Sequence, residues 1–287
     1  MPDKKQSNPK KPKVPKPGVF VSLMTDFGFK RIFGVKELML NFLNTVLDIE
    51  GGIVEIHYTN PEKLGLTKDE RKAIIDLICT TGNNEQIIVE MQAIPQEYFK
   101  DRVLFYASRI IQEQSIQGEN WDYKLPPVYS INILNFNLNK KEKTKKYVSV
   151  VQLIEKETHK VFYDKLTFVF IELKRFKKTI SELDNLYERW IYIIKYLQKL
   201  QNEPVEIQDK IFKLLFKTAK IANMTKNEVT NYLKDLINMN IVKNELELKD
   251  RKIAEMGAVI TQKDYALSQK DRIIAQYEQK YGTLNVK

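Results

Sequence analysis

The sequence is poor in the residues that build thiolate or imidazole sites. It contains one cysteine, Cys79, and two histidines, His57 and His159, among 287 residues. A single cysteine excludes an intramolecular disulfide framework and a structural zinc site built on several thiolates. The two histidines have no partners at metal-ligand spacing, so neither a zinc site nor a histidine-based nucleophilic pair is indicated.

Long apolar runs and glycine-rich phosphate loops are also missing. No stretch approaches the ~20 apolar residues of a membrane-spanning helix. No apolar segment follows the basic N-terminal residues, as it would in a signal peptide. Neither GxxxxGKS/T nor GxGxxG occurs, which argues against a P-loop or a dinucleotide site. With 43% hydrophobic residues, we expect a soluble, cytoplasmic protein of the bacterial type, with a hydrophobic core and no membrane partner.

Basic residues outnumber acidic ones, and half of the surplus is local. The net charge is +10, and residues 1–18 hold six lysines, one aspartate and five of the ten prolines. This segment is predicted to be a disordered basic tail, because its composition cannot form a packed core. The tail is either inert or a phosphate-binding arm. The wider surplus favours contact with a polyanion, although a lysine-rich composition explains it equally well.

Between the tail and residue 178, the hydrophobic period alternates between that of helices and that of strands. Apolar residues at three- and four-residue spacing predict a helix over 38–47, ended by Gly51 and Gly52, and another over 97–117. Short β-branched runs predict the strands. This order indicates an α/β fold with a mixed sheet flanked by helices. The predicted strands are 53–58, 73–80, 85–92, 127–136, 147–154 and 165–176.

From residue 181 onward the pattern is helical throughout. In the last forty residues an apolar side chain recurs at every seventh position, which is typical of a coiled coil. The positions three residues further on are mostly polar, and Gly257 lies inside the segment. The segment is therefore either an oligomerising coil, giving a homo-oligomer, or a helix that packs on its own domain. The predicted parts are a tail (1–18), a mixed-sheet domain (19–178), a helical region (179–244) and a coil (245–287).

Two acidic residues lie in very apolar predicted strands, where a buried charge is costly unless it is paired. If the turn between these strands is the three-residue loop at 82–84, Asp76 lies directly opposite Glu90, with β-carbons ~4.5–5.5 Å apart. Gln92 shares their face, because alternate residues of a strand point the same way. A two-residue turn would instead move the two acids to opposite faces.

Two carboxylates this close repel each other unless a proton or a divalent cation lies between them. Oxygen ligands suit Mg²⁺ or Mn²⁺, and the chemistry that follows is metal-assisted hydrolysis of a phosphodiester bond. Paired acids on strands are also found at exposed edges or in salt bridges, so the spacing alone does not decide whether a metal ion binds here.

Several segments together resemble the PD-(D/E)xK nuclease family transposases, a group that includes bacterial recombination-promoting nucleases. The similarity spans roughly residues 20–175 and implies a restriction-endonuclease-like fold. The matching residues are TDFGFKRIFG at 25–34, the strand of Asp76, IIVEMQ at 87–92, Arg102, Tyr106, Gly118 and PPVYSINILNF at 126–136.

The resemblance implies that Asp76, Glu90 and Asp26 gather the metal. Gln92 stands where the superfamily has a lysine; this replacement is typical of the subfamily, and a glutamine orients water or phosphate by hydrogen bonds without supplying a charge. From the residues themselves, Asp26 is equally well an N-cap, and Tyr106 is more readily a core residue than a catalytic one.

Three basic residues are candidates for contact with the nucleic-acid backbone: Lys30, Arg31 and Arg102. For Lys30 and Arg31 the competing interpretation is a solvated helix face, and for Arg102 it is a structural ion pair.

These observations predict a divalent-metal-dependent endonuclease that hydrolyses DNA and is associated with mobile elements or recombination. Asp76, Glu90 and Gln92 would be its catalytic residues, with Mg²⁺ or Mn²⁺ as cofactor. The main alternative is a catalytically inactive module that binds nucleic acid or protein and assembles through its C-terminal coil. The replaced lysine favours the alternative and the retained acids oppose it. An RNA nuclease is a third interpretation.

Overall fold

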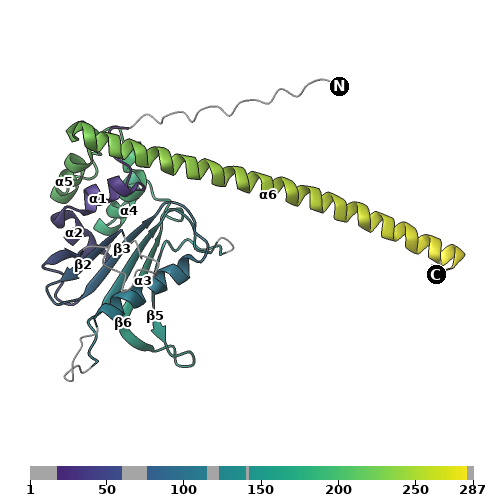
Figure 1. Cartoon of the computed structure of the whole chain (residues 1–287), viewed down its shortest axis with the longest axis horizontal. Helices are drawn as coiled ribbons and strands as arrows, with labels where there is room; N and C mark the ends of the chain where they lie inside the picture. The colour runs from purple at the N-terminus through teal and green to yellow at the C-terminus, as the bar shows by residue number, and fades with distance from the viewer. Residues whose placement is uncertain (1–17, 60–75, 115–122, 140–141, 283–287) are drawn as a thin grey trace, which may run out of the picture. The chain divides into compact units, whose positions relative to one another are not determined.

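A six-stranded mixed sheet organises the fold (Figure 1). The computed structural model describes residues 18–59, 76–114, 123–139 and 142–282. The strand order is β1-β2-β3-β4-β6-β5; β3, β4 and β6 are parallel neighbours, and the other pairs are antiparallel. The predicted mixed sheet is thus confirmed. Its strands are β1 (Ile56–Thr59), β2 (Leu77–Thr81), β3 (Gln86–Gln92), β4 (Val128–Leu134), β5 (Val148–Ile154) and β6 (Val161–Glu172).

The hairpin of β2 and β3 has the register that the sequence predicts. Its loop is Gly82-Asn83-Asn84, and Asn84 has φ 63°, the left-handed conformation that closes three-residue hairpin loops. The paired residues include Ile78 with Ile88 and Leu77 with Val89. Continuing this register by one residue places Asp76 opposite Glu90. Residues 60–75, which include the start of the predicted strand 73–80, lie outside the described part.

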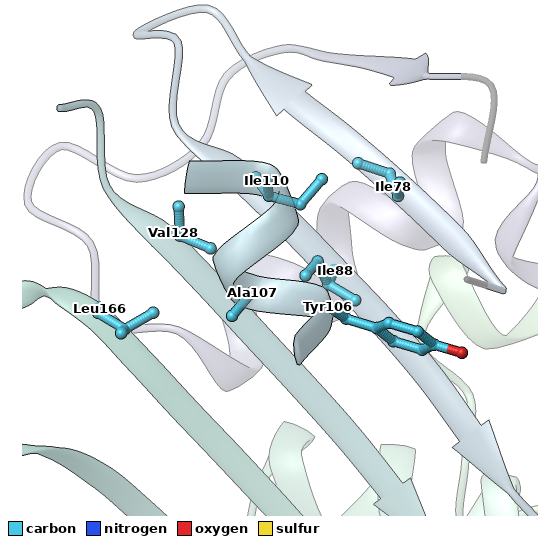
Figure 2. Packing of buried hydrophobic residues seen from close by; sticks show 7 residues of the cluster. All are labelled: Ile78, Ile88, Tyr106, Ala107, Ile110, Val128 and Leu166. Atoms are coloured by element: carbon cyan, nitrogen blue, oxygen red, sulfur yellow. The ribbon is translucent and has the colours of Figure 1, made fainter. Parts of the chain in front are cut away.

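Helix α3 (Phe99–Glu113) covers one face of the sheet. In Figure 2, Tyr106, Ala107 and Ile110 of this helix pack onto side chains of the strands below. Glu90 and Gln92 belong to this same face, because they alternate with buried residues that point to the other one. The strand residues of the cluster are Ile78, Ile88, Val128 and Leu166. The helix predicted at 97–117 is confirmed up to Glu113; residues 115–122 lie outside the described part.

Four further helices form a separate group around an aromatic core (Figure 1). Trp190 is fully buried and contacts Phe33, Phe42 and Phe212, with ring centroids 5.2–5.9 Å apart. Its indole N–H donates to the Oδ1 of Asn41 at 2.8 Å. Aromatic residues from two distant parts of the sequence therefore form one core, and this core fixes the helix that carries Asp26. The four are α1 (Asp26–Phe33), α2 (Lys36–Val46), α4 (Leu186–Tyr196) and α5 (Lys210–Ala219); short 3₁₀ turns precede α4 at Ile180–Glu182, follow it at Leu197–Lys199 and follow α5 at Ile221–Asn223.

The last helix, α6 (Lys226–Tyr281), is continuous across the predicted boundary between residues 244 and 245 and through Gly257. The chain divides into two compact units, Met1–Ile237 and Asn238–Lys287, so α6 belongs to both. The predicted division into four parts stays a prediction. Within the described residues, no helix is long and apolar enough to span a membrane.

Candidate active site

The candidate site lies where β2 begins and β3 ends, under the N-terminal half of α3. Asp76 and Glu90 are linked by two hydrogen bonds from the main chain. The N–H of Asp76 donates to Oε1 of Glu90 at 3.0 Å, and the N–H of Met91 donates to Oδ2 of Asp76 at 2.8 Å. Each carboxylate thus accepts a hydrogen bond from the main chain of the segment that carries the other acid. These bonds fix the two carboxylates close together on one face.

Gln92 and Arg102 complete the surroundings of Glu90. The side-chain amide of Gln92 donates to Oε2 of Glu90 at 2.9 Å, and Arg102 reaches the same oxygen at 3.4 Å. Arg102 also donates to the hydroxyl of Tyr106 at 2.8 Å and to Gln96 at 2.5 Å. From the sequence, Arg102 was a candidate either for contact with phosphate or for a structural ion pair. In the structure it forms an ion pair with Glu90.

Burial raises the pKa of both acids. Glu90 is 2% exposed; burial and the nearby charge of Asp76 raise its pKa to about 8, against the smaller opposing effect of Arg102. Burial also raises the pKa of Asp76, and the hydrogen bond from Met91 opposes this rise. A buried and a half-buried acid that favour protonation in this way form a site that a divalent cation would stabilise in the charged form.

This shift predicts how stability depends on pH. Because the pKa of Glu90 is higher in the folded protein than its usual value, the folded state binds more protons than the unfolded state between about pH 4.5 and 8. Without metal, the free energy of unfolding should therefore fall as pH rises through this window, by on the order of 2–4 kcal/mol. Urea unfolding at pH 5, 6.5 and 8 measures it.

The control for this prediction is Glu90→Gln, which cannot titrate and should flatten the profile. An equally steep profile in Glu90→Gln would contradict the assignment of the effect to this carboxyl group.

The third predicted ligand, Asp26, lies near the pair but does not join it. Its charge raises the pKa of Asp76, and the charge of Lys30 lowers it, so both side chains are close to that carboxylate. Asp26 forms an exposed ion pair with Lys30 at 2.9 Å. Among the described residues, no three histidine, cysteine, aspartate or glutamate side chains are grouped closely enough to hold a metal ion. The alternative role of Asp26 as an N-cap is wrong: Thr25 caps α1, accepting from the N–H of Gly28.

The three predicted backbone-binding residues differ in their surroundings. The side chain of Lys30 is 46% exposed. Arg31 is held by protein acceptors: it donates to the carbonyl of Thr218 at 2.8 Å and to Glu228 at 2.5 Å. Arg102 lies inside the site, as described above. Lys30 is therefore the most exposed of the three, and its protein partner is Asp26.

Sequence reasoning interpreted one neighbour of Glu90 as core and missed another. Tyr106, interpreted as core, does pack in the core, but its hydroxyl also accepts from Arg102. Asn132 is fully buried in β4 directly beside Glu90, and its Oδ1 has no hydrogen-bond partner in the structure. An asparagine within the apolar run 128–134 was a visible signal, but its place next to Glu90 depends on a parallel register that the sequence does not reveal.

The comparison with protein families agrees with this geometry. A family model described as PD-(D/E)XK nuclease family transposase matches residues 23–249, which is most of the chain. The chain belongs to this family. Its fold is accordingly the restriction-endonuclease-like one, and the matched residues include α4 and α5, which pack on α1 and α2. Neither the curated proteins nor the solved structures include a match to this chain.

Membership of the PD-(D/E)XK nuclease family implies nuclease-type chemistry and, in general, a divalent metal. The donor set fits such an ion in part: two carboxylates with raised pKa values converge, and both are oxygen ligands of the kind that Mg²⁺ and Mn²⁺ prefer. Gln92, which the resemblance of the sequence places where the superfamily has a lysine, already donates its amide N–H to Glu90. Its carbonyl oxygen is the end of the side chain that can accept a hydrogen bond from water.

Proposed function

We propose that this protein is a divalent-metal-dependent endonuclease that hydrolyses phosphodiester bonds of DNA. The observation that carries the proposal is the pair of carboxylates, the half-buried Asp76 and the buried Glu90, held close together by main-chain hydrogen bonds. Two acids with raised pKa values are costly to keep together without a cation. A structural role alone gives no reason to place both so close.

Each residue of the site has a distinct task in this proposal. Asp76 and Glu90 hold Mg²⁺ or Mn²⁺, with Asp26 as a third ligand once it leaves Lys30. When bound, the ion acts as a Lewis acid toward water and the phosphate. Gln92 accepts a hydrogen bond from the attacking water and orients it. Arg102 positions the carboxylate of Glu90 and favours its charged form.

Nicking of supercoiled plasmid by the purified full-length chain tests the proposal. Nicking should occur with Mg²⁺ or Mn²⁺ and stop with EDTA. A parallel reaction with single-stranded RNA of matched length distinguishes a ribonuclease. Binding of DNA without cleavage under either metal would favour the inactive binding module, which the replacement of the lysine by Gln92 supports.

We further infer that residues 238–281 of α6 form a parallel homodimeric coil. Every seventh residue from Leu246 to Ile274 is apolar, and Ile253, Ile260 and Leu267 are more than half exposed in the single chain. Counting these as position a of the heptad places the repeated Lys-Asp pairs at positions d and e. Position d lies in the core of a coiled coil, so the lysines there weaken the seam, and the aspartates at position e lie beside it, where charged residues set the choice of partner. The pairs are Lys249-Asp250, Lys263-Asp264 and Lys270-Asp271.

The coil predicts a dimer that one substitution on the seam disrupts. The full-length chain should sediment as a dimer at ~10 μM, and Ile260→Asp should shift it to monomer, because a charge at position a is buried in the interface. Ala258→Asp, on the opposite side of the same turn, is the matched control and should remain dimeric. A wild-type monomer at this concentration, measured by analytical ultracentrifugation, would refute the coil.

A further inference from the structure

A groove of about 670 Å³ lies between α1 and the first turns of α6, within the first compact unit. Its volume falls in the range of ~300–1,000 Å³ typical of ligand clefts. Charged side chains of both signs line it, together with a few small and apolar residues. The charged residues are Asp26, Lys30 and Arg31 from α1, and Glu228, Lys234 and Asp235 from α6.

The groove opens beside the carboxylate pair. Two of its lining residues, Asp26 and Lys30, act electrostatically on Asp76, as described above. They are the first and fifth residues of α1, one helical turn apart, and they form an ion pair across that turn. A nucleic-acid strand whose scissile phosphate lies at Asp76 and Glu90 would thus extend along this groove.

The acids of the groove are already bonded to protein donors. Glu228 accepts from Arg31, and Asp235 accepts from the main-chain N–H of Phe27 at 2.8 Å. Lys234 is exposed, and no acidic side chain of the described residues lies within ion-pairing distance of it. Lys30 is paired with Asp26 at 2.9 Å, and its side chain is 46% exposed. Lys234, which has no such acid beside it in the described part of the chain, and the half-exposed Lys30 are therefore the cationic groups that a phosphate could reach, one on each side of the groove.

We propose that this groove binds a backbone phosphate next to the scissile one, with Lys234 of α6 and Lys30 of α1 as its ligands. The inference rests on the proposed nuclease function. Lysine ammonium groups contact phosphate as point charges and do not read the sequence of bases. The start of α6 would then have two tasks. It fixes α1 through Asp235 and supplies a substrate contact one residue away.

Binding without cleavage tests this proposal. Fluorescence anisotropy of a labelled 25-base-pair DNA duplex in EDTA compares the full-length wild type with Lys234→Ala. We expect about 3- to 10-fold weaker binding and a salt dependence whose slope is smaller by about 1, as for the loss of one phosphate contact. The matched control is Lys213→Ala, an exposed lysine of α5 outside the groove.

A second arm replaces single phosphates of the duplex by neutral methylphosphonates. Replacement at one position of the duplex should weaken its binding to the wild type and leave its binding to Lys234→Ala unchanged. Equal affinities and equal salt slopes for wild type and Lys234→Ala would overturn the proposal, as would a wild type that does not bind DNA at all. The binding assay needs no cleavage, so the two proposals can fail separately. A protein that binds DNA through Lys234 but never nicks it would refute the proposed nuclease function and support phosphate binding in the groove.

Discussion

Glu90→Gln should lower the rate of metal-dependent DNA cleavage by at least about 10³-fold, equivalent to ~4 kcal/mol of transition-state stabilisation. Glutamine keeps the size and the burial of the side chain but removes the charge that holds the cation. Asp76→Asn should have a similar effect, and the double variant should lose little more than either single one, because the two carboxylates act as a unit. Initial rates of plasmid nicking measure all three.

Glu85→Gln is the matched control for this experiment. Glu85 precedes β3, is also buried, and bonds to Thr81 at the opposite end of the strand from the site. It should cleave like the wild type, which separates loss of the site from a general loss of stability. Cleavage by Glu90→Gln within about 10-fold of the wild-type rate would contradict the assignment of this residue.

Gln92→Ala should reduce kcat by about 10- to 100-fold and leave KM nearly unchanged. The residue contacts Glu90 and the expected position of the water, so its loss affects the chemical step more than binding. Gln92→Lys should retain cleavage, because its ammonium group can both pair with Glu90 and orient water. Its pH profile should move to lower pH, since a neighbouring cation lowers the pKa of a carboxyl group.

Single-turnover kinetics of the wild type, Gln92→Ala and Gln92→Lys across pH 6–9 separate these effects. If Gln92→Ala cleaves as fast as the wild type, Gln92 has no part in the reaction. In that case its bond to Glu90 is structural.

Local signals in the sequence identified the central hairpin and reduced its register to two alternatives. The structure has the three-residue loop at 82–84, and this register places Asp76 opposite Glu90. The acids themselves were visible because a charge in an apolar strand is unusual. The mixed sheet could also be predicted from the sequence, because the alternation of helical and strand periods indicates the class of fold.

What the sequence could not give depends on contacts between distant parts of the chain. The bond from Phe27 to Asp235 joins residues 208 positions apart. No local pattern indicates that α6 forms one wall of the groove, or that Arg31 is held by Glu228. The place of Asn132 beside Glu90 likewise requires the parallel pairing of β3 and β4, which only the complete fold specifies.

The packing of the helical region against the first helices of the sheet domain also depends on contacts between distant parts of the chain. Helices α4 and α5 bury their aromatic residues against α1 and α2, so the part of the chain after residue 178 completes the core that holds α1. A pattern of helical periodicity identifies these helices but does not say what they pack against.

Binding of Mn²⁺ to the purified chain tests the central claim most directly. Isothermal titration of the wild type should give saturable binding that strengthens from pH 6 to pH 8, because the cation must displace the protons that the raised pKa values retain on the two carboxyl groups. Glu90→Gln should lose this binding, and Glu85→Gln should keep it. A folded wild type that binds no Mn²⁺ at pH 8, or a Glu90→Gln variant that binds as well as the wild type, would contradict the proposal that Asp76 and Glu90 form a metal site.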